Sequence, residues 1–173
     1  YSIAGTITAG GAGLAGVTVD AGGGHTATTA ADGTYSIAGL VAGTYTLTPS
    51  KAEYTFSPTS SSVTVGPSAT GEDFTGTQNT YSISGTVAVS GVALAGVTMT
   101  ADDGAGHTGN ATTGADGKYT INGLIAGTYT LTPSKAEYTF NPTSSSVALG
   151  PSVSGEDFNA TLSLYSISGT ITA

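Results

Sequence analysis

Apolar residues alternate with serine and threonine along most of this chain. A period of two is typical of strands that have one buried and one exposed face. No stretch shows the period of about 3.6 that would indicate a helix. In the first part of the chain the pattern predicts strands near Ser2–Ala9, Val17–Ala21, Thr26–Ala30, Thr34–Ala38, Thr44–Pro49, Tyr54–Ser57, Ser61–Val65 and Glu72–Thr77.

Turn signals separate these strands. Ala-Asp-Gly occurs at residues 31–33 and again at 115–117, where an aspartate can accept hydrogen bonds from its own turn. Proline has no N–H to donate to a β-ladder, so it favours strand ends. We expect it there at Pro49, Pro58, Pro133 and Pro142. Seven or eight short strands with regular turns predict an all-β fold, an antiparallel sandwich.

The pattern occurs twice. GTYTLTPSKAEYTFSPTSSSV at residues 43–63 returns, with one change, at residues 127–147. The opening YSIAGTITA returns as YSISGTVAV from Tyr81 and as YSISGTITA at the end. The chain therefore predicts one sandwich repeat at 1–80 and a second at 81–164. Residues 165–173 would be the first strand of a third repeat, or a strand donated to a neighbour.

The second copy is longer by four residues between Val97 and Tyr119, since its start lies 80 residues after Tyr1 and 84 before Tyr165. Loop length costs little free energy, whereas an insertion disturbs a strand. We therefore expect the insertion in a surface loop.

Composition narrows the choice of partners. Only 8% of the residues are charged and the net charge is −8, which argues against nucleic acid and anionic membranes. No apolar run approaches the ~20 residues that span a bilayer, so we expect no membrane insertion. Cysteine is absent. Sparse charge suits an extracellular protein whose surface is packed in an assembly or covered by sugar.

The order of short motifs carries a resemblance. Each copy has Y-S-I-x-G-T, L-A-G-V-T, A-D-G-x-Y-x-I-x-G-L, A-G-T-Y-T-L-T-P and Y-T-F-x-P. The chain thus resembles the carboxypeptidase regulatory-like repeat, over nearly all of both copies. The resemblance implies a prealbumin-like, Ig-like sandwich, similar to the B-type repeats of bacterial surface adhesins. It also implies tandem modules of secreted proteins, as stalks or beside an enzyme, without catalytic residues.

The aromatic residues recur at equivalent positions in the two copies, and tryptophan is absent. A sugar-binding platform would need exposed aromatics, so we interpret most of them as core residues. Their hydroxyls would reach the rim of the sandwich or a backbone partner.

Carboxylates offer one weak metal site. Calcium requires six or more oxygen ligands, and the best place for it is the inserted segment with Asp102 and Asp103. Glu72 and Asp73 are adjacent, so on a strand they point to opposite faces and form no paired-carboxylate site. We expect no cofactor.

Catalysis is not expected either. His25 and His107 lie in glycine-rich loops without a nucleophile signature around them, and we interpret them as solvated. Lys51 and Lys135 lie close to glutamates in S-K-A-E-Y, where we expect solvated side chains. Some adhesin modules that resemble this chain instead cross-link lysine to asparagine.

Asn110 and Asn159 each begin an Asn-Ala-Thr triplet that fits the N-glycosylation pattern. The pattern is frequent by chance. O-linked sugar on the many serines and threonines is an equal alternative, so glycans are candidate partners, with Asn110 and Asn159 as candidate sites.

The strands carry almost no charge, although edge strands of soluble proteins are usually protected by charge or proline. We therefore expect the edges to be paired, and assign assembly to Tyr165, Ser166, Ile167, Ser168, Gly169, Thr170, Ile171, Thr172 and Ala173. The favoured function is a structural subunit of an extracellular bacterial fibre, pilus-like filament or surface stalk, with copies of itself as partners. The alternatives are an adhesin, a carbohydrate-binding accessory module, or a spacer of a larger secreted protein.

Overall fold

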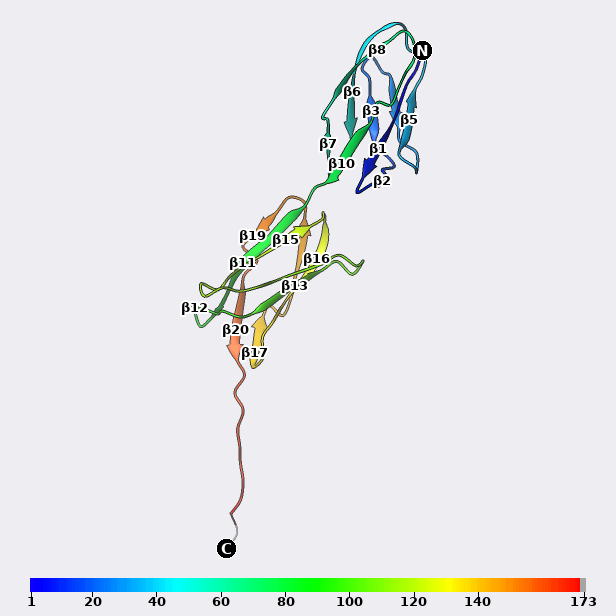
Figure 1. The fold of residues 1–173 in the computed structure, drawn as a ribbon. Helices are drawn as coiled ribbons and strands as arrows, with labels where there is room; N and C mark the ends of the chain where they lie inside the picture. The colour runs from blue at the N-terminus through cyan, green and yellow to red at the C-terminus, as the bar shows by residue number, and fades with distance from the viewer. Residues whose placement is uncertain (172–173) are drawn as a thin grey trace. The chain divides into compact units, whose positions relative to one another are not determined.

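The computed structural model describes residues 1–171 and contains no helix among them. The chain forms two compact units, unit 1 from Tyr1 to Asn79 and unit 2 from Thr80 onward (Figure 1). Each unit is a sandwich of two β-sheets around its own apolar core. The prediction of two tandem all-β, Ig-like sandwiches is confirmed.

Unit 1 contains ten strands, of which four have only two or three residues. They are β1 (Ile3–Ala9), β2 (Ala12–Gly13), β3 (Thr18–Asp20), β4 (Thr26–Thr28), β5 (Thr34–Ile37), β6 (Gly43–Ser50), β7 (Tyr54–Ser57), β8 (Ser61–Val65), β9 (Ala69–Thr70) and β10 (Phe74–Gln78).

Unit 2 repeats this order from β11 to β20. Its strands are β11 (Tyr81–Val89), β12 (Val92–Ala93), β13 (Thr98–Asp102), β14 (Thr108–Thr112), β15 (Lys118–Leu124), β16 (Gly127–Ser134), β17 (Tyr138–Asn141), β18 (Ser145–Leu149), β19 (Val153–Ser154) and β20 (Phe158–Leu162).

The first strand of each unit lies at the centre of one sheet. β1 pairs antiparallel with β5 and parallel with β9 along its first half, and then antiparallel with β2 and parallel with β10. β11 makes the same four pairings with β15, β19, β12 and β20. Most pairings are antiparallel, as the predicted antiparallel sandwich requires, but the first strand of each unit also has two parallel neighbours. Within each unit the chain crosses to the other sheet before it returns. The last two strands of the unit therefore run parallel to its first strand.

The second sheet has the order β4-β3-β6-β8 in unit 1 and β14-β13-β16-β18 in unit 2. Its inward residues alternate with exposed threonines, as the period of two predicts. Buried aromatics at Tyr35, Phe74, Tyr119, Tyr129 and Phe158 confirm the core interpretation for these positions. Tyr1 departs from it, because 57% of its surface is exposed.

Two prolines lie one residue inside the strand ends at which they were expected, since Pro49 and Pro133 are the second-to-last residues of β6 and β16. Pro49 pairs with Val19, and Pro133 pairs with Met99. The ladder between β6 and β8 ends at Leu47, so Pro49 has a strand neighbour on one side only. A position with one open side tolerates a residue that lacks an N–H group.

The four extra residues of unit 2 lengthen a hairpin instead of a loop. β3 and β4 pair at three positions, whereas β13 and β14 pair at five. Both hairpins close in the same way, since Ala21 N donates to His25 O at 2.9 Å and Asp103 N donates to His107 O at 3.3 Å. Two residues added to each strand preserve the alternation of faces, which is why the sheet accepts them.

A close approach of two backbones fixes the first strand. A Cβ atom at Gly5 would lie 2.0 Å from the carbonyl oxygen of Glu72, and one at Gly85 would lie 2.0 Å from that of Glu156. Neither glycine has a positive φ, so the requirement is for space. This contact explains the glycine in Y-S-I-x-G-T.

We expect Gly85→Ala to destabilise unit 2 by roughly 1–3 kcal/mol or more, because the new methyl group meets a backbone that cannot move aside. Gly127→Ala is the matched control, since its Cβ would have Tyr129 as nearest neighbour at 3.7 Å. The control should change stability by less than about 0.5 kcal/mol. Urea unfolding of the full chain, followed by amide NMR signals of unit 2, measures both. Equal effects of the two substitutions would contradict the steric argument.

Candidate functional site

The recurring first strand and the place that it occupies form the candidate site. We call this place the first-strand slot, and define it as the path of β1 between β5 on one side and β9 and β10 on the other. Apolar burial stabilises the strand there, since Ile3 and Ile7 of β1 are fully buried. Ile83 and Val87 occupy the same positions in unit 2 and are also fully buried.

Side chains of the slot also bind the backbone of the first strand. Ser68 Oγ accepts a hydrogen bond from Ser2 N at 2.9 Å, and Asp73 Oδ1 accepts one from Thr6 N at 2.7 Å. In unit 2 the corresponding donors are Ser82 N, to Ser152 at 3.0 Å, and Thr86 N, to Asp157 at 2.7 Å. The slot thus recognises a strand by two N–H groups as well as by its apolar side chains.

Glu72 and Asp73, which are adjacent in the sequence, have different roles in this arrangement. The hydroxyl of Tyr35 donates to the Glu72 carbonyl at 2.6 Å, and Ser61 Oγ donates to the Glu72 carboxylate at 3.3 Å. Asp73 binds the first strand instead. Sequence reasoning asked only whether the pair could be catalytic. The joint recurrence of G-E-D-F and Y-S-I-x-G-T in both copies was the signal that could have linked them.

Burial raises the pKa of the Tyr35 hydroxyl well above its ordinary value, and the nearby charges of Glu72 and Asp73 raise it further. Tyr119 repeats this shift in unit 2, where its hydroxyl donates to Glu156 O at 2.5 Å. Both hydroxyls therefore stay protonated at neutral pH and remain donors to the backbone that faces the first strand.

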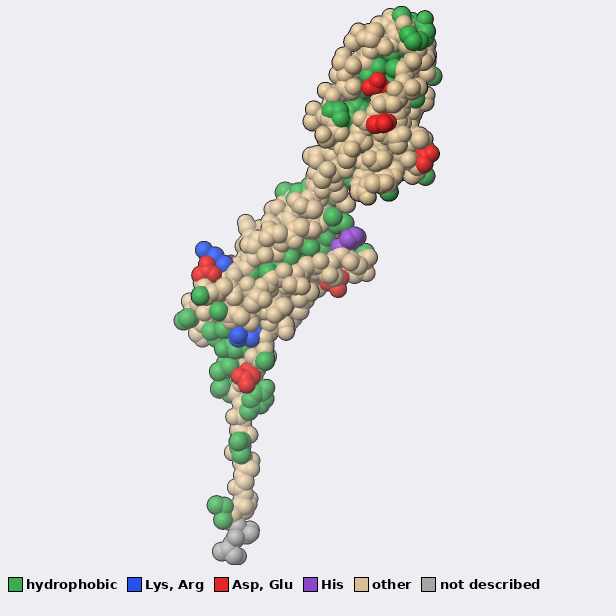
Figure 2. Space-filling model, in the orientation of Figure 1, with side chains coloured by type: hydrophobic (Ala, Val, Ile, Leu, Met, Phe, Trp, Pro, Cys, Tyr) green, Lys and Arg blue, Asp and Glu red, His purple; other side chains and the backbone are tan. Residues whose placement is uncertain are grey.

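The third copy of the strand is not part of a sheet. Residues 163–171 have no strand assignment (Figure 1). Ile167 is 103% exposed and Ile171 is 99% exposed, whereas their counterparts Ile3 and Ile7 are buried completely. Figure 2 shows apolar side chains along this C-terminal segment. Thr172 and Ala173, also assigned to assembly, lie outside the described residues.

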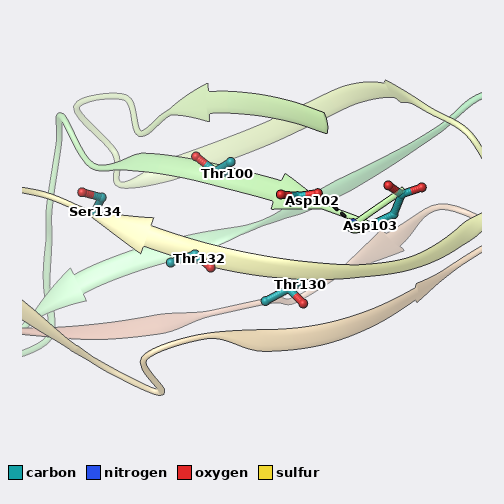
Figure 3. Close-up of a pocket in the computed structure, with 7 residues that line it drawn as sticks. Thr100, Asp102, Asp103, Thr130, Thr132 and Ser134 are labelled. Carbon is teal, nitrogen blue, oxygen red and sulfur yellow. Dashed lines mark hydrogen bonds between the residues drawn. The ribbon is translucent and has the colours of Figure 1, made fainter. Parts of the chain in front are cut away.

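The calcium candidate is the end of the lengthened hairpin (Figure 3). Asp102 and Asp103 line a groove of about 470 Å³ with hydroxyl side chains from β13 and β16. Asp102 Oδ1 accepts a hydrogen bond from Gly104 N at 2.8 Å. Within the described residues, no group of three or more histidine, cysteine, aspartate or glutamate side chains could hold a metal ion. The calcium site remains a prediction.

The Asp103 carboxylate is bound by groups of its own loop. Its Oδ1 accepts hydrogen bonds from Ala105 N at 2.8 Å and His107 N at 3.0 Å, and its Oδ2 lies 2.7 Å from His107 Nδ1. These contacts, with the His107 side chain first, lower the pKa of Asp103 to about 2. Unit 1 has Ala21 at the corresponding loop position. The aspartate–histidine contact thus belongs to unit 2.

Hydroxyl groups cover the outer face of the four-stranded sheet in each unit. Thr98 lies opposite both Thr112 and Ser134, and Thr100 lies opposite both Asn110 and Thr132. Asn110 is exposed within this face, and Asn159 is exposed on β20. Both positions are accessible, and their glycosylation remains a prediction. Figure 2 shows how few charged side chains interrupt such surfaces on the visible side.

The two lysines of S-K-A-E-Y contact the backbone. Lys51 Nζ donates to Ala15 O at 3.0 Å and lies 5.9 Å from the centre of the Tyr54 ring. Lys135 Nζ donates to Ala95 O at 3.0 Å. The expected solvated lysine is thus held at the surface by a carbonyl and an aromatic face. A covalent link from lysine to asparagine remains untested.

Comparison with known proteins identifies the family. Residues 2–75 and 82–163 each match the carboxypeptidase regulatory-like domain, and the chain belongs to this family. Chitinase ChiA of Flavobacterium johnsoniae is 37% identical over 152 residues, which are 82% of this chain and 9% of that protein. The chain therefore spans only a small part of this relative.

The fold also occurs in a solved structure. The Bacillus anthracis TIE protein aligns with a TM-score of 0.76 and 16% identity, over 93% of this chain and 34% of that one. A streptococcal ancillary pilin aligns at a TM-score of 0.43 and 15% identity, over 92% of this chain and 62% of that one. Among the described residues, no helix is long and apolar enough to cross a membrane.

We expect the Asp103 carboxylate to titrate with a midpoint near pH 2, below the ordinary 3.8. A lowered pKa means that the loop contacts are present at higher pH and are lost as the pH falls through 2. The carboxyl carbon shift of Asp103 in NMR reports the titration directly. Asp103→Ala, which copies the unit 1 loop, supplies the reference spectrum. A midpoint close to 3.8 would show that the hydrogen bonds do not favour the charged form.

Proposed function

We propose that this chain is a structural part of an extracellular bacterial fibre, pilus-like filament or surface stalk, in which β-sandwich units follow one another end to end. Its partners are copies of itself. The role is mechanical and non-catalytic, and the location is the outside of the cell. Membership of the carboxypeptidase regulatory-like family is compatible with this role, and two tandem units with the same strand order support it.

The observation that carries the proposal is the exposure of the third first strand. Apolar side chains that are buried in both units are fully exposed at Ile167 and Ile171. Both isoleucines need a partner surface if they are to be buried as their counterparts are. The segment also has no charged residue to prevent strand pairing. We therefore assign the contact between successive units to residues 165–173.

A second candidate function is a spacer or accessory module within a larger secreted protein. The likeness to chitinase ChiA favours it, because a match over 82% of this chain occupies only 9% of that protein. Modules of this kind would be joined by peptide bonds and would need no association between chains. The association state of the isolated chain separates the two candidates.

We expect the wild-type chain to associate end to end, and removal of residues 165–173 to yield dispersed monomers with both units folded. Sedimentation velocity across a range of concentrations and negative-stain electron microscopy measure this. Ile167→Asp with Ile171→Asp is the matched variant, because it keeps the length and removes only the apolar side chains. Filaments that persist after the deletion would contradict the assignment to this segment. Wild-type chains that stay monomeric at high concentration would favour the spacer.

A further inference from the structure

We propose that the open edge of β7 and the groove beside it bind an extended peptide that carries a carboxylate, and that β17 offers the same site in unit 2. The bound peptide adds one strand to the sheet of either unit. The site goes beyond the proposed assembly, because it does not depend on how successive units are joined.

The strand β7 lies at the edge of its sheet, since among the described residues it pairs with β10 alone. The ladder places Thr55 opposite Thr77, and Asn79 N donates to Glu53 O at 2.8 Å. In an antiparallel pair, every second residue directs its N–H and C=O groups to the partner strand. The backbone groups of Phe56 therefore point to the side that has no partner strand.

A groove of about 310 Å³ follows this open edge. It is lined by Tyr54, Thr55 and Phe56, consecutive residues whose side chains alternate between the two faces of β7. A groove in contact with all of them runs along the strand itself. The half-buried rings of Tyr54 and Phe56 make it partly apolar, and Ser50 and Thr59 add hydroxyl groups.

A lysine with a fixed position also lines this groove. Lys51 Nζ donates to Ala15 O at 3.0 Å and lies 5.9 Å from the centre of the Tyr54 ring. An ammonium group has further N–H donors beyond the one that Ala15 accepts. The chain has a net charge of −8, and Lys51 is the only lysine or arginine of unit 1. This local positive charge favours a ligand with a carboxylate.

The exposed backbone groups favour a peptide over an acidic sugar. Edge strands of soluble proteins are usually protected by charge or proline, and residues 54–57 contain neither. An extended peptide can pair with both the N–H and the C=O group of Phe56, and its alternate side chains can enter the groove. A sugar has no donors and acceptors at the spacing of a β-ladder.

Unit 2 repeats the edge and the lysine. β17 pairs with β20 alone in the part of the chain that the structure describes. Ser163 N donates to Glu137 O at 2.7 Å, so the ladder has the same phase as in unit 1. Lys135 Nζ donates to Ala95 O at 3.0 Å and lies 6.0 Å from the centre of the Tyr138 ring.

The two copies of this region are also nearly identical in sequence. Residues 43–63 and 127–147 differ only at Ser57, which corresponds to Asn141, whereas residues 1–20 and 81–100 differ at nine positions. Exposed residues away from special contacts contribute little to stability. The unchanged exposed positions, such as Thr55 and Thr59, therefore fit a binding role that both units share.

The test is a titration of the full chain with a set of blocked peptides of alternating threonine and valine, with one glutamate at each position in turn. We expect at least one peptide to shift the amide NMR signals of Phe56 and Phe140. Glutamine in place of the glutamate should weaken binding about three- to fivefold. Methylation of the backbone nitrogens that face β7 should weaken it about tenfold, because it removes ladder hydrogen bonds.

Lys51→Gln removes the charge and keeps an N–H donor for the Ala15 carbonyl. It should weaken binding at Phe56 about three- to fivefold and leave binding at Phe140 unchanged, so unit 2 is an internal control. Lys118→Gln is the matched control, because this exposed lysine lies outside both sites and pairs with Asp116 at 3.8 Å. It should change neither affinity.

The proposal is overturned if no peptide of the set shifts these signals, or if the methylated peptide binds as well as its parent. Equal effects of Lys51→Gln and Lys118→Gln would overturn the role of the lysine. Binding of a soluble oligogalacturonate in place of the peptides would assign the groove to an acidic sugar. Shifts at Phe56 that follow protein concentration without any ligand would assign the edge to a second copy. Deletion of residues 165–173 changes neither edge, so the proposed assembly is tested separately.

Discussion

The structure of each unit depends on its first strand, because that strand pairs on both sides and supplies the centre of one sheet. β1 pairs with β5, β9, β2 and β10, so its removal leaves β2, β5 and β9 without a partner and β10 with β7 alone. Hydrogen-bonding groups left unpaired in a buried place are costly. A strand in this position is therefore structurally indispensable.

The two units share their sterically demanding contacts and differ in others. The glycine beneath a backbone carbonyl, the aspartate that binds a strand N–H and the buried tyrosine hydroxyl occur in both units. The hairpin of unit 2 gained two residues on each strand, a change that preserves which face each side chain occupies. The turn of this hairpin contains Asp103, whose carboxylate contacts His107. The constrained part of each unit is thus its first-strand slot, and the variable part is the hairpin.

The alternation of apolar and hydroxyl residues was sufficient to predict the fold class and most strands, including β7 and β8 with their observed bounds. Pattern reasoning failed where the outcome depended on a neighbour in space. Pro49 fits into β6 because the ladder between β6 and β8 stops at Leu47. The four inserted residues lie in the β13–β14 hairpin, because each of its two strands is longer by two residues than its counterpart in unit 1. The role of Asp73 was invisible, since its partner Thr6 lies far away in the sequence.

The sequence by itself determined that this protein is a tandem all-β repeat of low charge, because side-chain periodicity and self-similarity are properties of the chain alone. It also identified residues 165–173 as a third copy of the first strand. Only the tertiary structure decided where the first strand of a unit lies. It revealed that β1 lies at the centre of a sheet, that Gly5 must leave room for the Glu72 carbonyl, and that Ile167 and Ile171 lack the burial of their counterparts. These are relations between segments distant in sequence, and periodicity along one strand carries no information about them.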